Sequence, residues 1–223
     1  MILTESEVVS IAPADLVHLY RDCPRCFVQK VRHGVRRPGV FPDVYNVADR
    51  AMKTAFADAA AEPVDLGVGP RFRVVAQGFR VKSAPIPFSR LGIALRFEGW
   101  IDALVRTTDD ELFLVDYKTT KAQDGLMTYR RQLAAYCFAL ENPWDARTMR
   151  YEIDGFALLV YRPYKFAYRN SGVAGLYGPS EWIELPRRDD LFLKFLEEMA
   201  ALLSQRDLPA PSPGCAYCAY RSL

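Results

Sequence analysis

Two acids and a lysine around one turn are the residues of this chain best suited to chemistry. The segment ELFLVDYK, residues 111–118, ends its apolar run in Asp116 and Lys118. Side chains alternate along a β-strand, so these two point to the same face. If the preceding turn centres near Asp109, Asp102 lies opposite Asp116, with Cβ atoms about 5 Å apart. A shift of one residue would move Asp102 to the other face.

Two carboxylates so close repel each other, and a divalent cation bound to both removes the conflict. Mg²⁺ and Mn²⁺ prefer oxygen ligands and keep several waters. Such an ion polarises a phosphoryl oxygen and lowers the pKa of a bound water, which a neighbouring lysine can orient. The pattern therefore suits metal-assisted hydrolysis of a phosphodiester. Taken by itself it also fits a strand end in solvent, with Asp116 and Lys118 as a surface ion pair.

The segment that follows makes the pattern more specific. Gln132 and Tyr136 are four residues apart and share one face of an expected helix. With them the chain resembles the PD-(D/E)XK nuclease superfamily, in particular its RecB-like exonuclease branch and the related CRISPR-associated exonucleases. That branch carries G-x-x-D, D-x-K and Q-x-x-x-Y in this order on two strands and a helix. The matching residues are Gly99-Trp100-Ile101-Asp102, Asp116-Tyr117-Lys118 and Gln132-Leu133-Ala134-Ala135-Tyr136.

The resemblance implies a metal-dependent deoxyribonuclease that acts as an exonuclease on single-stranded DNA or DNA ends. Asp102, Asp116 and the backbone carbonyl of Tyr117 would bind Mg²⁺ or Mn²⁺. Lys118 would position and activate the attacking water. The expected partners are DNA and a helicase or a CRISPR or DNA repair protein, and no membrane.

Other residues would line this site and contact the DNA. The resemblance gives that role to Gln132 and Tyr136, whose structural alternative is that the tyrosine packs in the core and the glutamine caps a polar edge. Basic and aromatic residues precede them at 129–131 and interleave in YRPYKFAYR, residues 161–169. Such segments suit single-stranded nucleic acid, through stacking and phosphate contacts, but also occur as ordinary solvated faces.

One position departs from the branch, which places a histidine on the helix before the sheet as a further metal ligand. The helix expected over 45–60 has none, and both histidines of the chain precede it. Asp49 is the nearest acidic substitute, either as a ligand or as an i, i+4 ion pair with Lys53. Glu98, expected on the same strand face as Asp102, is a further candidate. The missing histidine motivates an alternative function, a non-catalytic nucleic-acid-binding or assembly module.

Four of the five cysteines form two widely separated C-x₂-C pairs, a metal-site signature, while Cys137 is expected in the core. Four thiolates suit Zn²⁺ or an iron–sulfur cluster, and a shared site would join the two ends of the domain. Local disulfides or a redox C-x-x-C are the alternatives. The ligands would be Cys23, Cys26, Cys215 and Cys218.

The resemblance favours iron–sulfur among these options. Nucleases of the branch often close the domain with a 4Fe–4S cluster whose ligands come from both chain ends, and CPRC and CAYCAYR resemble those two elements. The commoner division is one N-terminal and three C-terminal cysteines, whereas here it is two and two. Zn²⁺ therefore remains the alternative cofactor at the four cysteines.

The elements that must position these residues follow from hydrophobic periodicity. The order of helices and strands predicts an α/β fold, with a central mixed β-sheet flanked by helices, resembling the core of restriction endonucleases. In the helix near the C-terminus, the expected apolar face comprises Leu191, Phe195, Met199, Leu202 and Leu203. Helices are expected over 13–23, 45–60, 124–140 and 189–205, and strands over 72–81, 93–105, 111–118, 155–163 and 181–186.

We expect a single domain over 1–223, with 93–186 as the nuclease core and 1–62 and 189–223 as helical, cysteine-bearing ends. The net charge of +2 is too close to zero to argue for or against nucleic acid. MILTESEVVS lacks a basic stretch followed by an apolar one, so no signal peptide is expected. No apolar run reaches the length of a membrane span, and a cytoplasmic location is the expectation.

Overall fold

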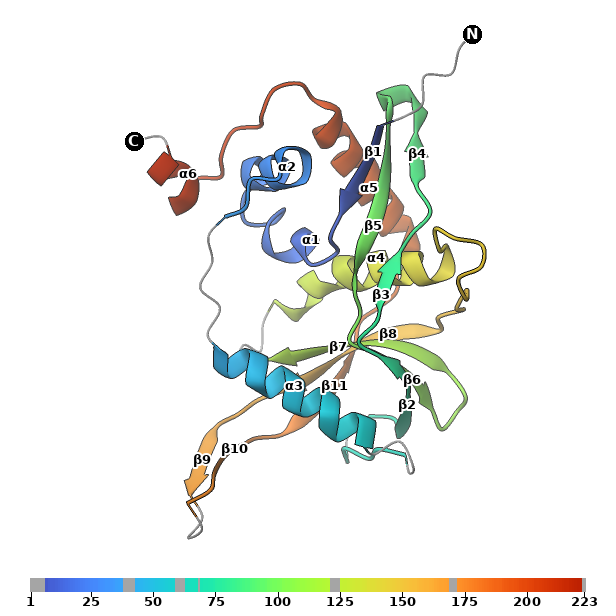
Figure 1. The fold of residues 1–223 in the computed structure, drawn as a ribbon, viewed down its shortest axis with the longest axis vertical. Coiled ribbons are helices and arrows are strands. Elements are labelled where there is room, and N and C mark those ends of the chain that lie inside the picture. Colours follow the sequence, from blue (N-terminus) through green and yellow to red (C-terminus); the bar gives the residue numbers. More distant parts are fainter. Residues whose placement is uncertain are drawn as a thin grey trace.

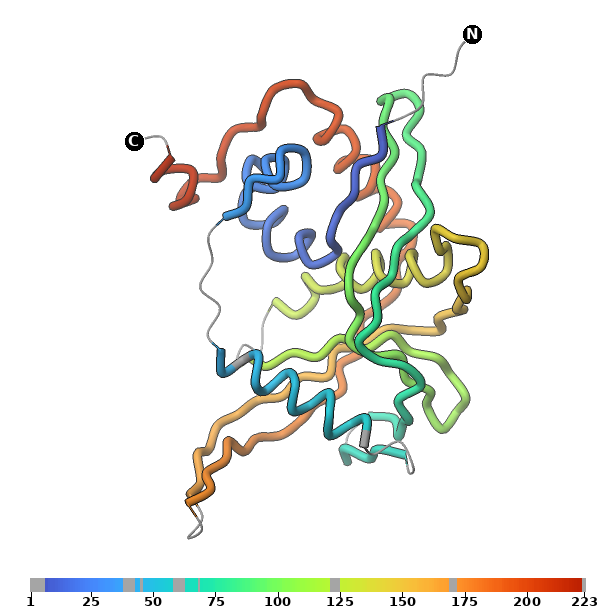
Figure 2. The backbone as a smooth tube through the Cα atoms, in the orientation of Figure 1, coloured from blue at the N-terminus to red at the C-terminus, as the bar shows by residue number. Residues whose placement is uncertain are grey.

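Two β-sheets, each mixing parallel and antiparallel pairs, form the framework of this computed structural model (Figures 1 and 2). The structure describes residues 7–37, 43–58, 63–67, 69–120, 125–168 and 172–221. The expected α/β fold with mixed sheets flanked by helices is confirmed.

The first sheet has the order β1-β5-β3, and β4 also pairs with β5. Within it, β1 and β5 run parallel and the other pairs are antiparallel. Its strands are β1 (Glu7–Ile11), β3 (Arg80–Lys82), β4 (Ile86–Phe88) and β5 (Ile93–Trp100).

The second sheet has the order β11-β8-β7-β6-β2, with β7 and β8 parallel. Its two faces are buried against different layers, because alternate side chains of β7 enter two separate hydrophobic clusters. Its strands are β2 (Phe72–Gln77), β6 (Ala103–Thr107), β7 (Leu112–Thr119), β8 (Gly155–Tyr161) and β11 (Ser180–Glu184).

Two long β segments of the sequence pass from one sheet to the other. The strand expected over 93–105 divides into β5 and β6 at Ile101 and Asp102. The one expected over 72–81 divides into β2 and β3 at Gly78, whose φ of 63° suits glycine. The segments cross side by side, since Gly78 donates its N–H to the Asp102 carbonyl at 3.0 Å. Asp102 therefore lies where the two sheets meet.

Helices cover the sheets on both sides (Figure 1). α3 packs against β7 and β2, and α4 contacts β7, β5 and α5. None of the helices in the described segments is long and apolar enough to cross a membrane. The helices are α1 (Asp15–His18), α2 (Pro24–His33), α3 (Asp43–Asp58), α4 (Arg130–Glu141), α5 (Asp189–Ser204) and α6 (Ala216–Arg221), with 3₁₀ turns η2 (Ser89–Leu91) and η3 (Leu126–Tyr129).

Several helix predictions need correction. The helix expected over 13–23 is limited to the four residues of α1, while α2 was not predicted. α3 starts at Asp43, and residues 59, 60 and 124 of the expected helices lie outside the described segments. On α5 the buried face includes Phe192 rather than Leu191, which is 40% exposed. The buried spacing from Phe192 is three and four residues, which keeps one stripe on the core.

A second feature that the sequence did not predict is a two-stranded hairpin, β9 (Lys165–Tyr168) with β10 (Ala174–Tyr177). It projects away from both sheets (Figure 1). Phe166 and Tyr168 are each 68% exposed, so the aromatic residues singled out in this segment are open to solvent. Arg169 lies outside the described segments.

Candidate functional site

The hairpin of β6 and β7 sets the geometry of the site. Ala103 pairs with Val115, and extending this register by one residue on each strand sets Asp102 opposite Asp116. The turn is closed by the Thr107 N–H, which donates to the Glu111 carbonyl at 2.9 Å. The register expected from the sequence is confirmed.

Asp116 is buried, with 6% of its surface exposed. Its Oδ1 accepts a hydrogen bond from Gln132 Nε2 of α4 at 3.0 Å, and Lys118 forms an ion pair with its Oδ2. Burial raises the pKa of the Asp116 carboxyl to about 6, with a further contribution from the Asp102 charge, although Lys118 acts in the opposite direction.

Lys118 stays protonated in this setting. Burial acts to lower the pKa of its amine, but the Asp116 carboxylate and other anionic neighbours outweigh burial, and the pKa is raised. The ammonium also lies 4.8 Å from the centre of the Tyr129 ring, a cation–π contact. Lys118 is thus held between an acid on its own strand and an aromatic ring ahead of α4.

Asp102 is shared between the strand next to it and a helix. Its Oδ2 accepts the Tyr117 backbone N–H at 2.8 Å, and its Oδ1 lies 2.8 Å from Lys53 Nζ of α3. The same ammonium lies 2.8 Å from Asp49 Oδ2. The i, i+4 ion pair weighed for Asp49 is therefore formed, and it extends to Asp102. No local pattern in the sequence points to this third partner.

Tyr136 and Gly99 connect the helix motif to the first strand motif. A Cβ atom at Gly99 would lie 3.0 Å from the Tyr136 hydroxyl and 3.1 Å from its ring, so glycine leaves the space that this ring needs. Tyr136 is buried, and burial together with the Asp116 and Asp102 charges raises its pKa. Its hydroxyl therefore keeps its proton at neutral pH.

Glu98 does not belong to this group. It was considered because a continuous strand would have put it on the same face as Asp102. That premise is wrong, since β5 ends at Trp100 and the chain then changes sheets. Glu98 instead forms an ion pair with Arg80 of β3.

Comparison with known proteins bears on the arrangement of Asp102, Asp116, Lys118, Gln132 and Tyr136. Residues 27–223 match the model of a family described as the PD-(D/E)XK nuclease superfamily. The chain belongs to this superfamily. It is thus a member of a superfamily of metal-dependent nucleases, which hydrolyse phosphodiesters.

One solved structure has a fold similar to that of this PD-(D/E)XK chain. The structure described as "Crystal structure of SSO0001" matches with a TM-score of 0.51 and 14% sequence identity, over 96% of this chain and 84% of that one. At this identity the likeness concerns the fold alone. No curated protein matches the chain significantly.

The PD-(D/E)XK chain carries a second group of reactive side chains, the cysteines at its two ends. The Sγ atoms of the two C-x₂-C pairs all lie within 4.8 Å of one another, and all five cysteines of the chain are free thiols. The alternative of local disulfides is therefore not what the structure shows. Cross-pair distances are 3.8 Å for Cys23–Cys218, 3.7 Å for Cys26–Cys215 and 3.5 Å for Cys26–Cys218.

Two helix starts bring these thiols together. Cys23 is the N-cap of α2, where Pro24 suits the first helical position, and Cys215 directly precedes α6. Burial acts to raise the pKa of the Cys23 thiol, but hydrogen bonds from backbone and thiol groups outweigh it and lower this pKa to about 6. Burial raises the pKa of the Cys26 and Cys218 thiols, so Cys23 is the readier of these three to ionise. A thiolate is the form that binds a metal. The donor set therefore fits a metal centre, whose identity the geometry leaves open.

Proposed function

We propose that this chain is a metal-dependent deoxyribonuclease of the RecB-like branch, acting as an exonuclease on single-stranded DNA or DNA ends. The observation that carries the proposal is the convergence of Asp102, Asp116 and Lys118 at the junction of the two sheets, with Gln132 bonded to Asp116. Membership of the nuclease superfamily supports the reaction class.

In this proposal Asp102, Asp116 and the backbone carbonyl of Tyr117 hold Mg²⁺ or Mn²⁺, and Asp49 adds a fourth oxygen. All are hard oxygen donors of the kind both ions prefer. One ammonium, that of Lys53, already lies 2.8 Å from carboxylate oxygens of both Asp49 and Asp102, so these two acids can share a cation. When bound, the ion polarises the phosphoryl group and lowers the pKa of a water ligand.

The other residues act on the water and the phosphate. The protonated Lys118 orients the attacking water and stabilises negative charge that develops on the phosphate. Gln132 fixes the orientation of the Asp116 carboxylate through their 3.0 Å hydrogen bond. Tyr136, whose hydroxyl stays protonated, donates a hydrogen bond to the DNA strand.

We also propose that the four cysteines bind a 4Fe–4S cluster, with Zn²⁺ as the alternative, and that the partners include a helicase or a CRISPR or repair protein. The gathering of four thiols at the starts of α2 and α6 supports a shared metal centre. Iron–sulfur rests on the resemblance to the branch alone, since Sγ–Sγ distances of 3.5–3.8 Å also match a tetrahedral Zn²⁺ site with Zn–S bonds of about 2.3 Å. Protein purified without oxygen is expected to be brown and to contain iron and sulfide. A colourless protein that contains zinc and no iron would overturn the iron–sulfur assignment.

One observation favours a second function, a non-catalytic nucleic-acid-binding or assembly module. Lys53 lies between Asp49 and Asp102, where a catalytic metal would have to displace it. α3 also lacks the histidine that the branch usually places there. A module of this kind would bind DNA without metal-stimulated cleavage.

Cleavage of end-labelled DNA with Mn²⁺ separates the two functions. Wild-type protein is expected to digest single-stranded DNA, and Lys118→Ala to lower the rate at least about 100-fold, because charge stabilisation at the phosphate is removed. Lys82→Ala serves as the matched control, since Lys82 lies on β3 and contacts Trp144. Equal, poor digestion by wild type and Lys118→Ala, with DNA binding retained, would support the non-catalytic function instead.

A further inference from the structure

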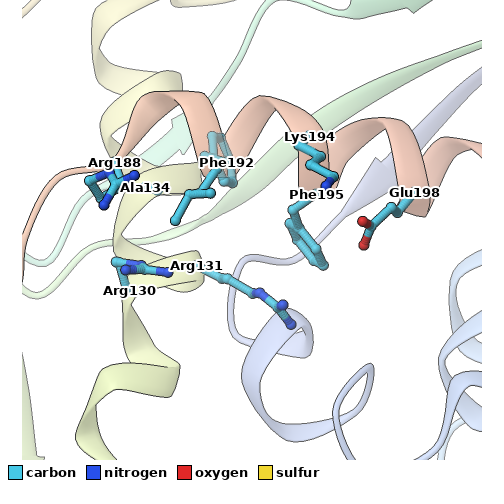
Figure 3. Close-up of a pocket in the computed structure, with 9 residues that line it drawn as sticks. Arg130, Arg131, Ala134, Arg188, Phe192, Lys194, Phe195 and Glu198 are labelled. Atoms are coloured by element: carbon cyan, nitrogen blue, oxygen red, sulfur yellow. The ribbon is translucent and has the colours of Figure 1, made fainter.

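A basic pocket lies on the seam between α4 and α5, apart from the acid–base cluster (Figure 3). Its volume is about 210 Å³. α4 and α5 form its opposite sides, and aromatic side chains of α5 contribute apolar surface. The lining residues that matter most are Arg130, Arg131, Arg188, Lys194, Phe195 and Glu198.

The pocket carries more cations than acids. Arg188 is neutralised by Asp190, with two nitrogen–oxygen distances of 3.1 Å. Among the described residues, no carboxylate forms an ion pair with Arg130, Arg131 or Lys194. Glu198 is the one acid in the lining. The remaining positive charge favours an anion.

One of these cations is held in place by aromatic rings. The Arg131 guanidinium lies 4.2 Å from the centre of the Phe195 ring and 5.9 Å from that of Tyr20. Figure 3 shows this side chain extended below the Phe195 ring of α5. An arginine that stacks on a ring keeps the N–H groups at its edge available for a phosphate.

The pocket and the candidate active site share the start of α4. Tyr129 contacts Lys118, the next two residues line the pocket, and Gln132 then bonds to Asp116. With a rise of about 1.5 Å per helical residue, the two sites lie within a few residues' length of each other. A nucleic-acid strand held at Lys118 can therefore place another of its phosphates in the pocket.

We propose that this pocket binds a phosphate group of the nucleic-acid strand, other than the one being hydrolysed. The proposal rests on the proposed nuclease function. It gives Arg130 and Arg131 a specific ligand and adds Lys194 of α5 and Arg188, which directly precedes that helix. Local sequence does not connect these two residues to the site. The phosphate comes either from the strand backbone or from a strand end.

The test measures binding rather than cleavage. In a Lys118→Ala background without added divalent metal, fluorescence anisotropy compares single-stranded oligonucleotides bound by parent and by Arg130→Glu/Lys194→Glu. We expect at least a tenfold drop in affinity. The salt dependence should also become shallower, by about 0.7 in log–log slope for each phosphate that the variant no longer neutralises. Thermal melts confirm that the variants fold.

The control is Arg147→Glu/Arg150→Glu, which makes the same change in net charge on the exposed loop after α4. It is expected to bind within twofold of the parent. Unchanged binding by the pocket variant, or equal weakening by the control, would overturn the proposal. Oligonucleotides with and without a 5′-phosphate, and with and without a 3′-phosphate, separate the two sources. If the pocket binds a strand-end phosphate, the pocket variant loses affinity only for oligonucleotides that carry that phosphate. If it binds the strand backbone, the loss is the same with and without it.

A second measurement keeps the pocket testable if nucleic acid is not the substrate. The ³¹P signal of inorganic phosphate is expected to broaden with the parent protein and not with Arg130→Glu/Lys194→Glu. Absence of broadening and of oligonucleotide binding would end the pocket proposal. If wild type cleaves DNA and the pocket variant binds oligonucleotides as the parent does, the proposed nuclease function is supported and the proposed phosphate site is refuted.

Discussion

At the scale of single residues, Lys53 most affects how a metal would bind. Its ammonium offsets the charges of both Asp49 and Asp102, and these anions raise its pKa although burial opposes them. A divalent ion would have to replace it. The lysine therefore holds the two acids in position without metal, and at the proposed metal site it would compete with the ion.

Lys53→Met is expected to tighten Mn²⁺ binding roughly tenfold, equivalent to about 1.4 kcal/mol, because two acids then lack a competing cation. The metal-free variant should also lose stability, as Asp102 keeps a charge without its partner. Isothermal titration with Mn²⁺ measures the affinity. Arg50→Met, at an exposed position of the same helix, is the matched control. Weaker Mn²⁺ binding by Lys53→Met would show that the lysine supports the metal site instead.

Asp116 makes stability depend on pH. Burial raises its pKa to about 6 in the folded protein, against about 3.9 in an unfolded chain. A raised folded pKa contributes stability that is fully present below about pH 4 and is lost as pH rises through about 6. Without metal, this residue should lower the free energy of unfolding by about 1–3 kcal/mol between roughly pH 4 and 7.

Urea unfolding of wild type and Asp116→Asn across this range tests the expectation. The free energy of unfolding of Asp116→Asn should lack this part of the decline with rising pH, because the asparagine side chain does not ionise. Other titrating groups, such as His18, affect both proteins alike and cancel in the comparison. Parallel pH profiles for the two proteins would mean that the carboxyl ionises near its ordinary pKa.

At the scale of elements, Gly99 of β5 and Tyr136 of α4 fit together closely. A methyl group at Gly99 would approach the tyrosine hydroxyl to 3.0 Å and its ring to 3.1 Å, so the buried Tyr136 side chain would have to shift. Gly99→Ala is therefore expected to cost about 1–3 kcal/mol of stability and to lower activity. In a Tyr136→Leu background the stability cost should shrink, which a double-mutant cycle measures. If Gly99→Ala costs as much stability in the Tyr136→Leu background, the strain does not come from contact with Tyr136.

Elements also show what local sequence can predict. The β6–β7 register was predictable because turn position and side-chain alternation are local properties, and they set Asp102 opposite Asp116. The change of sheet at Ile101 was not predictable, because β-propensity continues through this residue. Which sheet a strand joins depends on partners distant in the sequence. Lys53 was recognised only as half of an i, i+4 pair, since its contact with Asp102 is tertiary. The start of α2 was missed because C-P-x-C was interpreted as a metal motif alone.

At the scale of the whole molecule, the four cysteines connect α2 with α6 across almost the full sequence. Thiols so far apart in the sequence meet only when the chain is folded, so the unfolded chain offers no such site. A metal bound only by the folded protein adds its binding energy to stability. The bound centre should therefore dominate the resistance of the two ends to unfolding.

Cys215→Ala is expected to lower stability by on the order of 3–5 kcal/mol and the melting temperature by about 10 °C. Cys137→Ala is the control, because that buried thiol lies outside the four-cysteine group and its removal should leave metal content unchanged. Calorimetry and metal analysis measure both effects. Hydrogen exchange should rise first in α2 and α6. Equal melting temperatures for Cys215→Ala and Cys137→Ala would mean that the four-cysteine group does not stabilise the contact between the two ends of the chain.

The distance along the sequence between the two cysteine pairs also sets an order of events during synthesis. Every residue of the acid–base cluster, from Asp49 to Tyr136, is translated before Cys215 and Cys218. A chain still on the ribosome can thus assemble both sheets while its metal centre is incomplete. If the proposed metal binds there, its loading would be the final maturation step, and the supply of that metal would decide when a newly made molecule becomes fully rigid.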